Sequence, residues 1–275
     1  MPIPPDFRFS QASLRDYLAC PRRFQLRYLE RLAWPAIEAE PYLSREQHLK
    51  RGALFHRLVE QKLKSIPEQA LTALAAENNL AEWWDAFLVF DAGLPDGERL
   101  PEWTITVRLG QYALIAKYDL LIPSADGKVH IYDWKTSSIR TKPDVLRNDI
   151  QTRLYLLMAV EAGGSLHGGE AFPPENLSLC YWFAAFPREP EIIAYSEALY
   201  KRDRADILEL IDKIATAPVE SFVLTSDERQ CRYCVYRSYC ERGVTAGQAD
   251  DLDDDAIPES DPEAFDFSQA AEVAF

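Results

Sequence analysis

Three charged side chains within two apolar strand patterns constrain this chain more than any other feature. Residues 113–123 form a mostly apolar run around Asp119, and residues 128–137 alternate so that Asp133 and Lys135 share one face of a strand. The turn at residues 124–127 predicts an antiparallel hairpin, in which Asp119 lies near Asp133 with Lys135 beside both. A carboxylate in an apolar strand is costly without a partner, so these charges predict a functional or paired arrangement.

Two interpretations of these charges stay open from the strands alone. Two carboxylates at close range repel each other unless a divalent cation lies between them, and hard oxygen ligands suit Mg²⁺ or Mn²⁺. This interpretation predicts a metal site with Lys135 at its rim. In the other interpretation, Asp119 and Asp133 are solvated carboxylates at strand ends, paired with Lys117 and Lys135.

The rest of the pattern predicts an α/β domain with helices around a central sheet. Residues 102–109 alternate as a strand and turn at Gly110-Gln111 into the Asp119 strand, which makes an antiparallel meander of three strands. The apolar run at 178–186 suits the centre of the sheet, and 192–195 reads as a shorter strand. Helices are expected after Ser10 and at 21–30, 49–63, 68–90 with an interruption near Asn78, 143–162 and 197–215.

Charge divides the chain into a body, residues 1–248, and an acidic tail, residues 249–275. Ten acidic and no basic residues lie between Asp250 and Phe275, so that of the formal net charge of −14 only −4 falls on the rest. Such a tail is expected to be disordered. The mildly acidic charge of the body argues against general electrostatic binding of nucleic acid, but not against a local basic groove. Because no stretch is as apolar and long as a membrane span or signal peptide, we expect a soluble, cytoplasmic protein.

The second strong signal is a cysteine trio, Cys231, Cys234 and Cys240, within ten residues. A cytoplasmic protein is not expected to keep disulfides, so a metal explains the trio better. Cys20 is the expected fourth ligand, since Cys20-Pro21 breaks a helix in a basic neighbourhood. Cys180 lies inside an apolar strand and is expected to be a packed thiol. Four cysteines suit Zn²⁺ and an iron–sulfur cluster alike.

Two further sets of polar residues are weak signals by themselves. His56 shares a helical stripe with Glu60, and a lone histidine there is more often a core residue than a ligand. Gln151 and Tyr155 lie one helical turn apart, where an exposed glutamine beside a half-buried tyrosine is the common case.

Together these residues resemble the RecB-like branch of the PD-(D/E)XK nuclease superfamily, in the iron–sulfur-bearing group that includes the AddB nuclease domain and the CRISPR-adaptation exonucleases. The resemblance runs from Ser10 to about Arg242. Each motif alone is weak, but their order and spacing are specific. The motifs are Cys20-Pro-Arg-Arg-Phe, Gly52-Ala-Leu-Phe-His56, Asp119, Asp133-Trp-Lys135, Gln151-Thr-Arg-Leu-Tyr155 and the cysteine trio.

The resemblance implies a restriction-endonuclease-like core with a mixed sheet, an antiparallel meander and a crossover helix. It implies that Lys135 orients the attacking water, and that Gln151 and Tyr155 help to place Lys135 and the DNA strand. The implied metal ligands are His56, Asp119, Asp133 and the backbone carbonyl of Trp134. The implied ligands of a [4Fe-4S] cluster, which would join the N- and C-terminal segments, are Cys20, Cys231, Cys234 and Cys240.

The expected function is therefore that of a Mg²⁺- or Mn²⁺-dependent deoxyribonuclease, an exonuclease on single-stranded or frayed DNA ends, in repair, recombination or DNA uptake. No phosphate-binding loop of a motor is present, so any helicase would be a separate partner. The family usually has a glycine where this chain has Ala116, which leaves an alternative: a weak or inactive nucleic-acid-binding accessory module with a structural cluster. The side chains expected to contact DNA phosphates are Arg22, Arg23, Arg27, Arg232 and Arg237.

Overall fold

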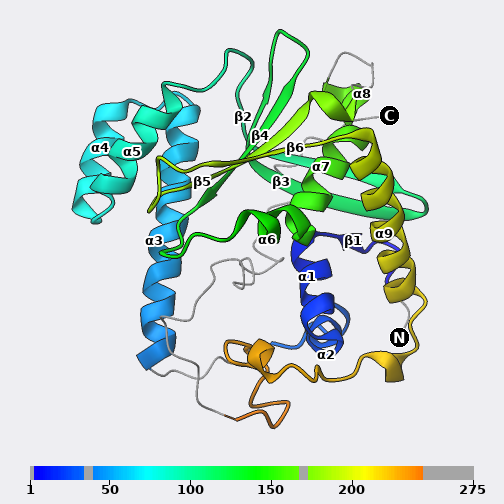
Figure 1. The fold of residues 1–275 in the computed structure, drawn as a ribbon. Coiled ribbons are helices and arrows are strands. Elements are labelled where there is room, and N and C mark those ends of the chain that lie inside the picture. The colour runs from blue at the N-terminus through cyan, green and yellow to red at the C-terminus, as the bar shows by residue number, and fades with distance from the viewer. Residues whose placement is uncertain (1–2, 34–39, 167–172, 244–275) are drawn as a thin grey trace.

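The computed structural model of the chain describes residues 3–33, 40–166 and 173–243. Within these ranges the strands form one mixed sheet in the order β1-β3-β4-β5-β6, with β2 paired to β3 (Figure 1). The strands are β1 (Arg8–Phe9), β2 (Leu100–Leu109), β3 (Tyr112–Pro123), β4 (Val129–Lys135), β5 (Leu177–Phe183) and β6 (Glu191–Ala194). The helices are α1 (Gln11–Ala19), α2 (Pro21–Phe24), α3 (Glu40–Leu63), α4 (Glu68–Glu77), α5 (Ala81–Asp91), α6 (Pro143–Asn148), α7 (Ile150–Glu161), α8 (Gly163–Leu166) and α9 (Glu197–Ala215).

Helices cover both faces of the sheet, because its strands alternate between two hydrophobic cores. Val129 and Ile131 of β4 lie in the core that α1, α7 and α9 complete, whereas Tyr132 and Trp134 lie in the core under α3, α4 and α5. Figure 1 shows α3, α4 and α5 on one side of the sheet and α7 and α9 on the other. The period-two pattern of β4 thus places Asp133 on the α7 face. The predicted α/β class with a mixed central sheet flanked by helices is confirmed.

The predicted antiparallel meander is also confirmed. β2 pairs with β3 and β3 with β4, both antiparallel, while β5 runs parallel to β4 and pairs with β6 on its other edge. The apolar run that forms β5 therefore lies inside the sheet, as expected of a strand buried on both faces. The connection from β4 to β5 passes through α6, α7 and α8.

Helix boundaries follow local capping chemistry. Ser10 caps α1 by accepting a hydrogen bond from the Ser13 N–H, and Ser196 caps α9 in the same way, as predicted. Cys20 is extended before Pro21, so the predicted break is present. The single helix predicted for residues 143–162 is wrong: Asp149 is extended, and its side chain caps a new helix, α7, by accepting from the Gln151 N–H.

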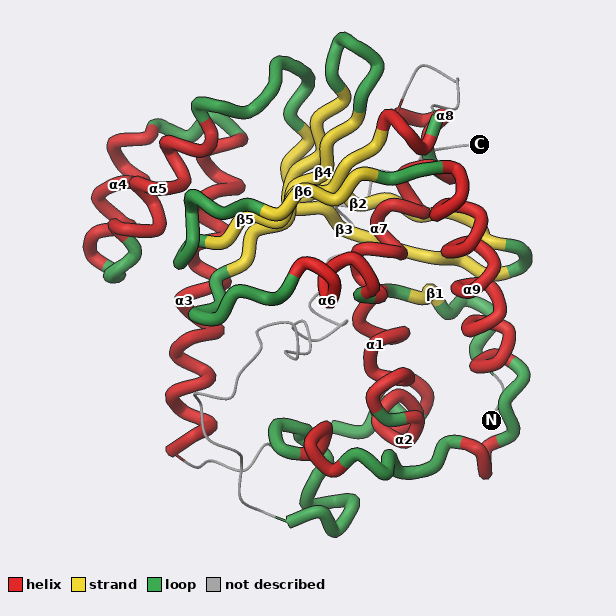
Figure 2. The backbone as a smooth tube through the Cα atoms, viewed as in Figure 1, coloured by secondary structure: helices red, strands yellow, loops and turns green. Residues whose placement is uncertain are grey.

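The segment after α9 returns to the N-terminal helices. It is mostly loop in Figure 2 and runs past α2. The Arg22 N–H donates to the Val223 carbonyl at 3.1 Å, and the Tyr236 hydroxyl donates to the Leu32 carbonyl at 3.0 Å. The N- and C-terminal segments are thus joined by direct contacts. The acidic tail lies outside the described residues, and the boundary at residue 248 stays a prediction.

No helix among the described segments combines the length and the apolar composition needed to cross a lipid bilayer.

Candidate active site

The site lies where β3 and β4 separate. Their backbone pairing runs from Pro123↔Val129 to Leu120↔Tyr132. One residue further along β3, the Asp119 carboxylate accepts the Trp134 N–H at 2.7 Å. The Asp119 side chain thereby accepts the backbone N–H of Trp134 just beyond the last backbone pair of β3 and β4.

The alternation of β3 also changes at Asp119. Ala116 and Tyr118 point into the core beside α7, whereas Leu120 and Ile122 point into the core beside α3. Opposite this point on β2, Glu102 has a positive φ of 52°, a conformation that is strained for a residue with a side chain. The fold therefore places an irregular pair of strands beside these carboxylates. Ala116 itself is 4% exposed, so its methyl group contributes to the core.

Helix α3 brings His56 to Asp119. The His56 Nδ1 lies 3.4 Å from the Asp119 Oδ1. One turn earlier, a Cβ atom on Gly52 would lie 2.7 Å from the Thr136 Oγ1, which is closer than real Cβ contacts allow. A glycine at this position therefore lets α3 pass close to the end of β4.

We expect Gly52→Ala to lower the activity of this candidate site about tenfold, because the added methyl group displaces α3 from Thr136 and moves His56, and displacements below 1 Å are costly in an active site. Alanine is the better helix former, so the melting temperature is not expected to report this change. The matched test is Thr136→Ala, which removes the clashing oxygen. In the Thr136→Ala background, Gly52→Ala should then lower the activity less than twofold. An equal loss in both backgrounds would contradict this explanation.

Glu102 is a candidate ligand that the sequence interpretation missed. His56, Glu102 and Asp119 each offer one ligand atom, and these atoms lie within 4.8 Å of one another. Glu102 also pairs with Lys117. A signal was available, because the turn at Gly110-Gln111 sets a register that puts Glu102 opposite Asp119.

The charges of this group act strongly on one another. Burial alone would lower the pKa of His56, because it disfavours the charged imidazole. The negative charge of Asp119, with smaller contributions from Asp133 and Glu102, outweighs burial and raises the His56 pKa to about 9. Burial likewise opposes the charge on Asp119, yet His56 and the Trp134 N–H lower its pKa. The pKa of Glu102 is raised, first by burial and then by Asp119. Carboxylates that crowd one another in this way favour a cation between them.

A second set of polar contacts surrounds Lys135. Its Nζ lies 3.1 Å from the Asp133 Oδ2 and donates to the Gln151 Oε1 at 3.0 Å. The Gln151 Nε2 donates to the Asp133 Oδ1 at 2.8 Å. The ammonium also lies 5.1 Å from the centre of the Tyr181 ring. Gln151 is 4% exposed, so the ammonium is held in one position by a buried partner.

Tyr155 supports the site from one turn further along α7. Its hydroxyl donates to the Lys117 carbonyl at 2.8 Å, two residues before Asp119, and its own carbonyl accepts from the Tyr118 hydroxyl at 2.9 Å. These bonds tie α7 to β3. Tyr155 is buried and makes structural contacts here; a contact of Tyr155 with DNA stays a prediction.

We expect Mn²⁺ to bind about tenfold more tightly for each unit of pH between about 6 and 8. Since the His56 pKa is raised to about 9, the metal-free imidazole is protonated in this range and must release its proton before its nitrogen can bind a metal ion. Affinity therefore rises with pH and levels off above about 9. Calorimetric titrations in two buffers of different ionisation enthalpy count the released protons.

The variant His56→Gln should flatten this pH dependence. His130→Gln is the control, because His130 contacts Ser178 at 3.0 Å and burial lowers its pKa. A wild-type protein that releases no proton on binding Mn²⁺ would contradict the proposed role of His56.

Of the predicted metal ligands, the structure brings His56 and Asp119 together in one group. Asp133 belongs to no group of three possible ligands within 4.8 Å among the described residues. It lies beside that group, bound by Lys135 and Gln151. The ligand roles of Asp133 and of the Trp134 carbonyl stay predictions.

The four cysteines of the predicted cluster influence one another. Burial comes first in raising the pKa values of the Cys231, Cys234 and Cys240 thiols, and the charge of Cys20 adds to it in all three. No three of their sulfur atoms lie within 4.8 Å of one another in the described part of the chain. Cys180 is 6% exposed in β5, and burial raises its pKa to about 12, as expected of a packed thiol.

The arginines expected to contact DNA differ in their surroundings. Arg237 is buried and donates to the Arg232 carbonyl, so it is unsuited to a direct phosphate contact. Arg23 and Arg27 both pair with the buried Asp16.

Comparisons with known proteins give one family for the chain and a broad structural likeness. Among solved structures, SSO0001 is similar over 87% of this chain and 88% of its own length, at 14% identity and a TM-score of 0.43. A candidate exonuclease from Eubacterium rectale is similar over 76% of this chain and 81% of its own, at 12% identity and a TM-score of 0.46. No curated protein matches the chain.

The family model described as the PD-(D/E)XK nuclease superfamily matches residues 8–241. This span begins in β1 and ends just after the cysteine trio, and it contains the strands and helices described above. The chain therefore belongs to the PD-(D/E)XK nuclease superfamily.

Proposed function

We propose that this chain is a metal-dependent deoxyribonuclease of the RecB-like branch, an exonuclease that hydrolyses phosphodiester bonds at single-stranded or frayed DNA ends. The observation that carries the proposal is the group formed by His56, Glu102 and Asp119, whose ligand atoms lie within 4.8 Å of one another. Lys135 is near enough for its charge to help lower the Asp119 pKa. The two carboxylates suit Mg²⁺ or Mn²⁺, and the imidazole nitrogen favours Mn²⁺ of the two.

The residues of this chain would divide the reaction between them. His56, Glu102 and Asp119 would hold the metal ion, with Asp133 and the Trp134 carbonyl as further ligands. A bound metal ion supplies polarisation of a phosphate oxygen and a lowered pKa for a bound water.

The ammonium of Lys135 would stabilise the negative charge that develops on the phosphate in the transition state. Asp133 and Gln151 hold that ammonium in place before substrate arrives, at 3.1 Å and 3.0 Å. The Trp134 N–H fixes the orientation of the Asp119 carboxylate. Positioning of this kind is the protein's main contribution to phosphodiester hydrolysis.

Digestion of DNA labelled at opposite ends tests this function. The purified chain should degrade single strands with Mn²⁺ or Mg²⁺ and should leave them intact with neither. Asp133→Ala should abolish degradation, and Asp126→Ala, in the exposed turn of the hairpin, should not. Binding of DNA without degradation under any metal would favour the accessory module instead.

We also propose that the chain works in the cytoplasm, in repair, recombination or DNA uptake, beside a separate helicase or recombination partner that supplies unwound ends. None of the five cysteines, all of which lie in the described residues, forms a disulfide, which fits a reducing compartment. Blunt duplexes should then resist the chain alone and be degraded once a helicase is added. Rapid degradation of blunt duplexes by the chain alone would argue against a required partner.

We further propose that Cys20, Cys231, Cys234 and Cys240 bind a [4Fe-4S] cluster rather than Zn²⁺. Their thiols act on one another electrostatically, yet no three of the sulfur atoms fall within 4.8 Å in the described residues. A single tetrahedral zinc ion, with Zn–S bonds of about 2.3 Å, draws its sulfurs to within about 4 Å of one another. A cluster spreads them more widely, because each cysteine binds a different iron atom.

Anaerobically purified protein should therefore be brown, with visible absorbance and about four iron atoms per chain. Cys20→Ser should lose the colour and unfold at a lower temperature. Cys180→Ser, in β5, is the matched control and should keep the colour. Colourless protein with one zinc per chain would establish the alternative.

A further inference from the structure

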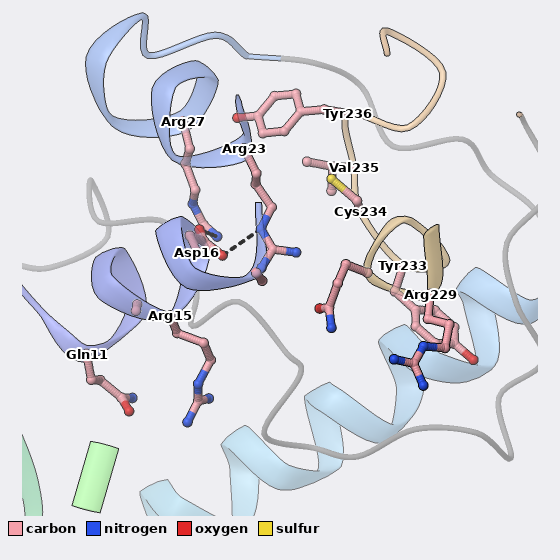
Figure 3. A pocket seen from close by; sticks show the side chains of 13 residues that line it. Gln11, Arg15, Asp16, Arg23, Arg27, Arg229, Tyr233, Cys234, Val235 and Tyr236 are labelled. Atoms are coloured by element: carbon pink, nitrogen blue, oxygen red, sulfur yellow. Dashed lines mark hydrogen bonds and ion pairs between the residues drawn. The ribbon is translucent and has the colours of Figure 1, made fainter. Parts of the chain in front are cut away.

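A hollow lined by arginines lies between the N-terminal helices and the C-terminal segment, away from His56 and Asp119 but beside the cysteine trio, since Cys234 is part of its lining. Its volume is about 100 Å³, and its lining includes Arg15, Arg23, Arg27 and Arg229. In Figure 3, Arg23 points from α2 toward the C-terminal segment, and Arg229 lies on that segment. Segments some two hundred residues apart in sequence therefore bring their positive charges together here. We call this hollow the arginine pocket.

Positive charge exceeds negative charge in the arginine pocket. The one carboxylate in its lining is Asp16, which is 4% exposed and pairs with both Arg23 and Arg27. Arg15 pairs with Asp149 and Arg229 with Asp227, which lie outside the lining. Even with these neighbours included, four guanidinium groups face three carboxylates. Such an excess favours an anion.

The size and the chemistry of the arginine pocket fit a phosphate group. The volume of about 100 Å³ is well below the roughly 300 Å³ at which sites for whole drug-sized ligands start. A phosphomonoester fits a space of this size and carries a charge near −2, whereas an internal phosphodiester carries only −1, so clustered guanidinium groups attract the terminal group more strongly. Guanidinium groups match phosphate oxygens with two parallel hydrogen bonds.

The arginine pocket is linked to the candidate active site by direct hydrogen bonds. Arg15 donates to the Asp149 Oδ1 at 2.9 Å, and the same oxygen accepts from the Gln151 N–H at 2.7 Å. The Gln151 side chain then contacts both Asp133 and Lys135. A phosphate bound beside Arg15 would thus be anchored to the helix that positions the catalytic lysine.

The cysteines do not explain all of this positive charge. Arg23 acts on the Cys231 and Cys234 thiols, and charge balance for a cluster would explain its position. Neither Arg15 nor Arg229 is among the main influences on the described cysteine thiols. The cysteines therefore leave Arg15 and Arg229 available to an anion that would share them with Asp149 and Asp227.

We propose that the arginine pocket binds the terminal phosphate of a nucleic-acid strand and so selects phosphorylated strand ends. The proposal rests on the proposed nuclease function and adds a feature of the substrate to it. The pocket would hold the end of a strand in a fixed position relative to Lys135. Such an arrangement suits an exonuclease, because an exonuclease removes nucleotides starting from a strand end.

Binding of matched oligonucleotides tests the proposal. Single strands of one sequence, labelled internally, carry a phosphate or a hydroxyl at the 5′ or 3′ end, and anisotropy is measured on the full-length protein without divalent metal. One of the phosphorylated ends should bind about tenfold more tightly than its hydroxyl counterpart, the gain expected of one charge-assisted contact. Inorganic phosphate should reduce this ratio. A ratio below twofold at both ends would overturn the proposal.

The variants use the ratio of the two affinities, because a ratio cancels any general loss of positive charge. Arg229→Gln should reduce it below twofold, and Arg229 is 82% exposed, so folding should not depend on it. Arg204→Gln on α9, where Arg204 is 44% exposed and pairs with Glu161, should keep the full ratio. An unchanged ratio in Arg229→Gln would also overturn the proposal.

The experiments distinguish a failure of this proposal from a failure of the proposed nuclease function. Binding without metal does not depend on cleavage, so a chain that never cuts DNA can still prefer phosphorylated ends. Conversely, a chain that degrades both kinds of end at one rate, and binds them equally, is a nuclease without a terminal-phosphate site.

Discussion

Replacing Lys135 with methionine is expected to lower kcat for DNA cleavage about 10³-fold while KM and the affinity for Mn²⁺ change less than about threefold. The ammonium acts on charge that exists in the transition state, and loss of one such contact costs about 10²- to 10³-fold in kcat. Methionine keeps the length of the side chain, so the packing against the Tyr181 ring is largely preserved. Single-turnover cleavage and a separate Mn²⁺ titration measure the two quantities.

The control for this variant is Lys128→Met, since Lys128 is 56% exposed in the hairpin turn and pairs with Asp126. It should cleave at the wild-type rate. A Lys135→Met protein with more than about a tenth of wild-type activity would mean that the ammonium has no catalytic part.

Replacing Asp119 with asparagine is expected to weaken Mn²⁺ binding at least 100-fold and to reduce cleavage about 10³-fold at ordinary metal concentrations. The amide oxygen can still accept the Trp134 N–H, so geometry is kept while the charge is lost. The His56 pKa should fall at the same time, because Asp119 is the main group that raises it. Calorimetry and cleavage across a range of Mn²⁺ concentrations check this.

Metal concentration separates the two variants. Excess Mn²⁺ should restore part of the cleavage by Asp119→Asn, because its defect is in binding, and none of the cleavage by Lys135→Met. The melting temperature of Asp119→Asn should stay near that of the wild type, since the lost repulsion with Glu102 offsets the lost attraction to His56. A marked loss of stability would assign Asp119 a structural role instead.

Much of the fold could be predicted because it depends on neighbours in sequence. Alternation in β4 placed Val129 and Ile131 in one core and Trp134 in the other. Serine caps at Ser10 and Ser196 start helices through bonds to residues three positions away. Such signals act over one or two turns of chain and need no tertiary partner.

The errors came from the same local chemistry, incompletely applied. The helix predicted for residues 143–162 is broken at Asp149, because aspartate is a strong N-cap and its carboxylate accepts the Gln151 N–H. Glu102 was not among the predicted ligands, although the Gly110 turn sets it opposite Asp119. Both residues flank the candidate site, where local rules are often broken for function.

By itself, the sequence determined the strands of the antiparallel meander, the faces on which Asp133 and Lys135 lie, and the motifs that mark a PD-(D/E)XK nuclease. The tertiary structure alone decided that β3 and β4 part at Asp119, that α3 delivers His56 past Gly52, and that Arg15 and Arg229 meet across one pocket. The reason is physical: periodicity and capping depend on nearby residues, whereas the approach of distant segments depends on how all side chains pack together.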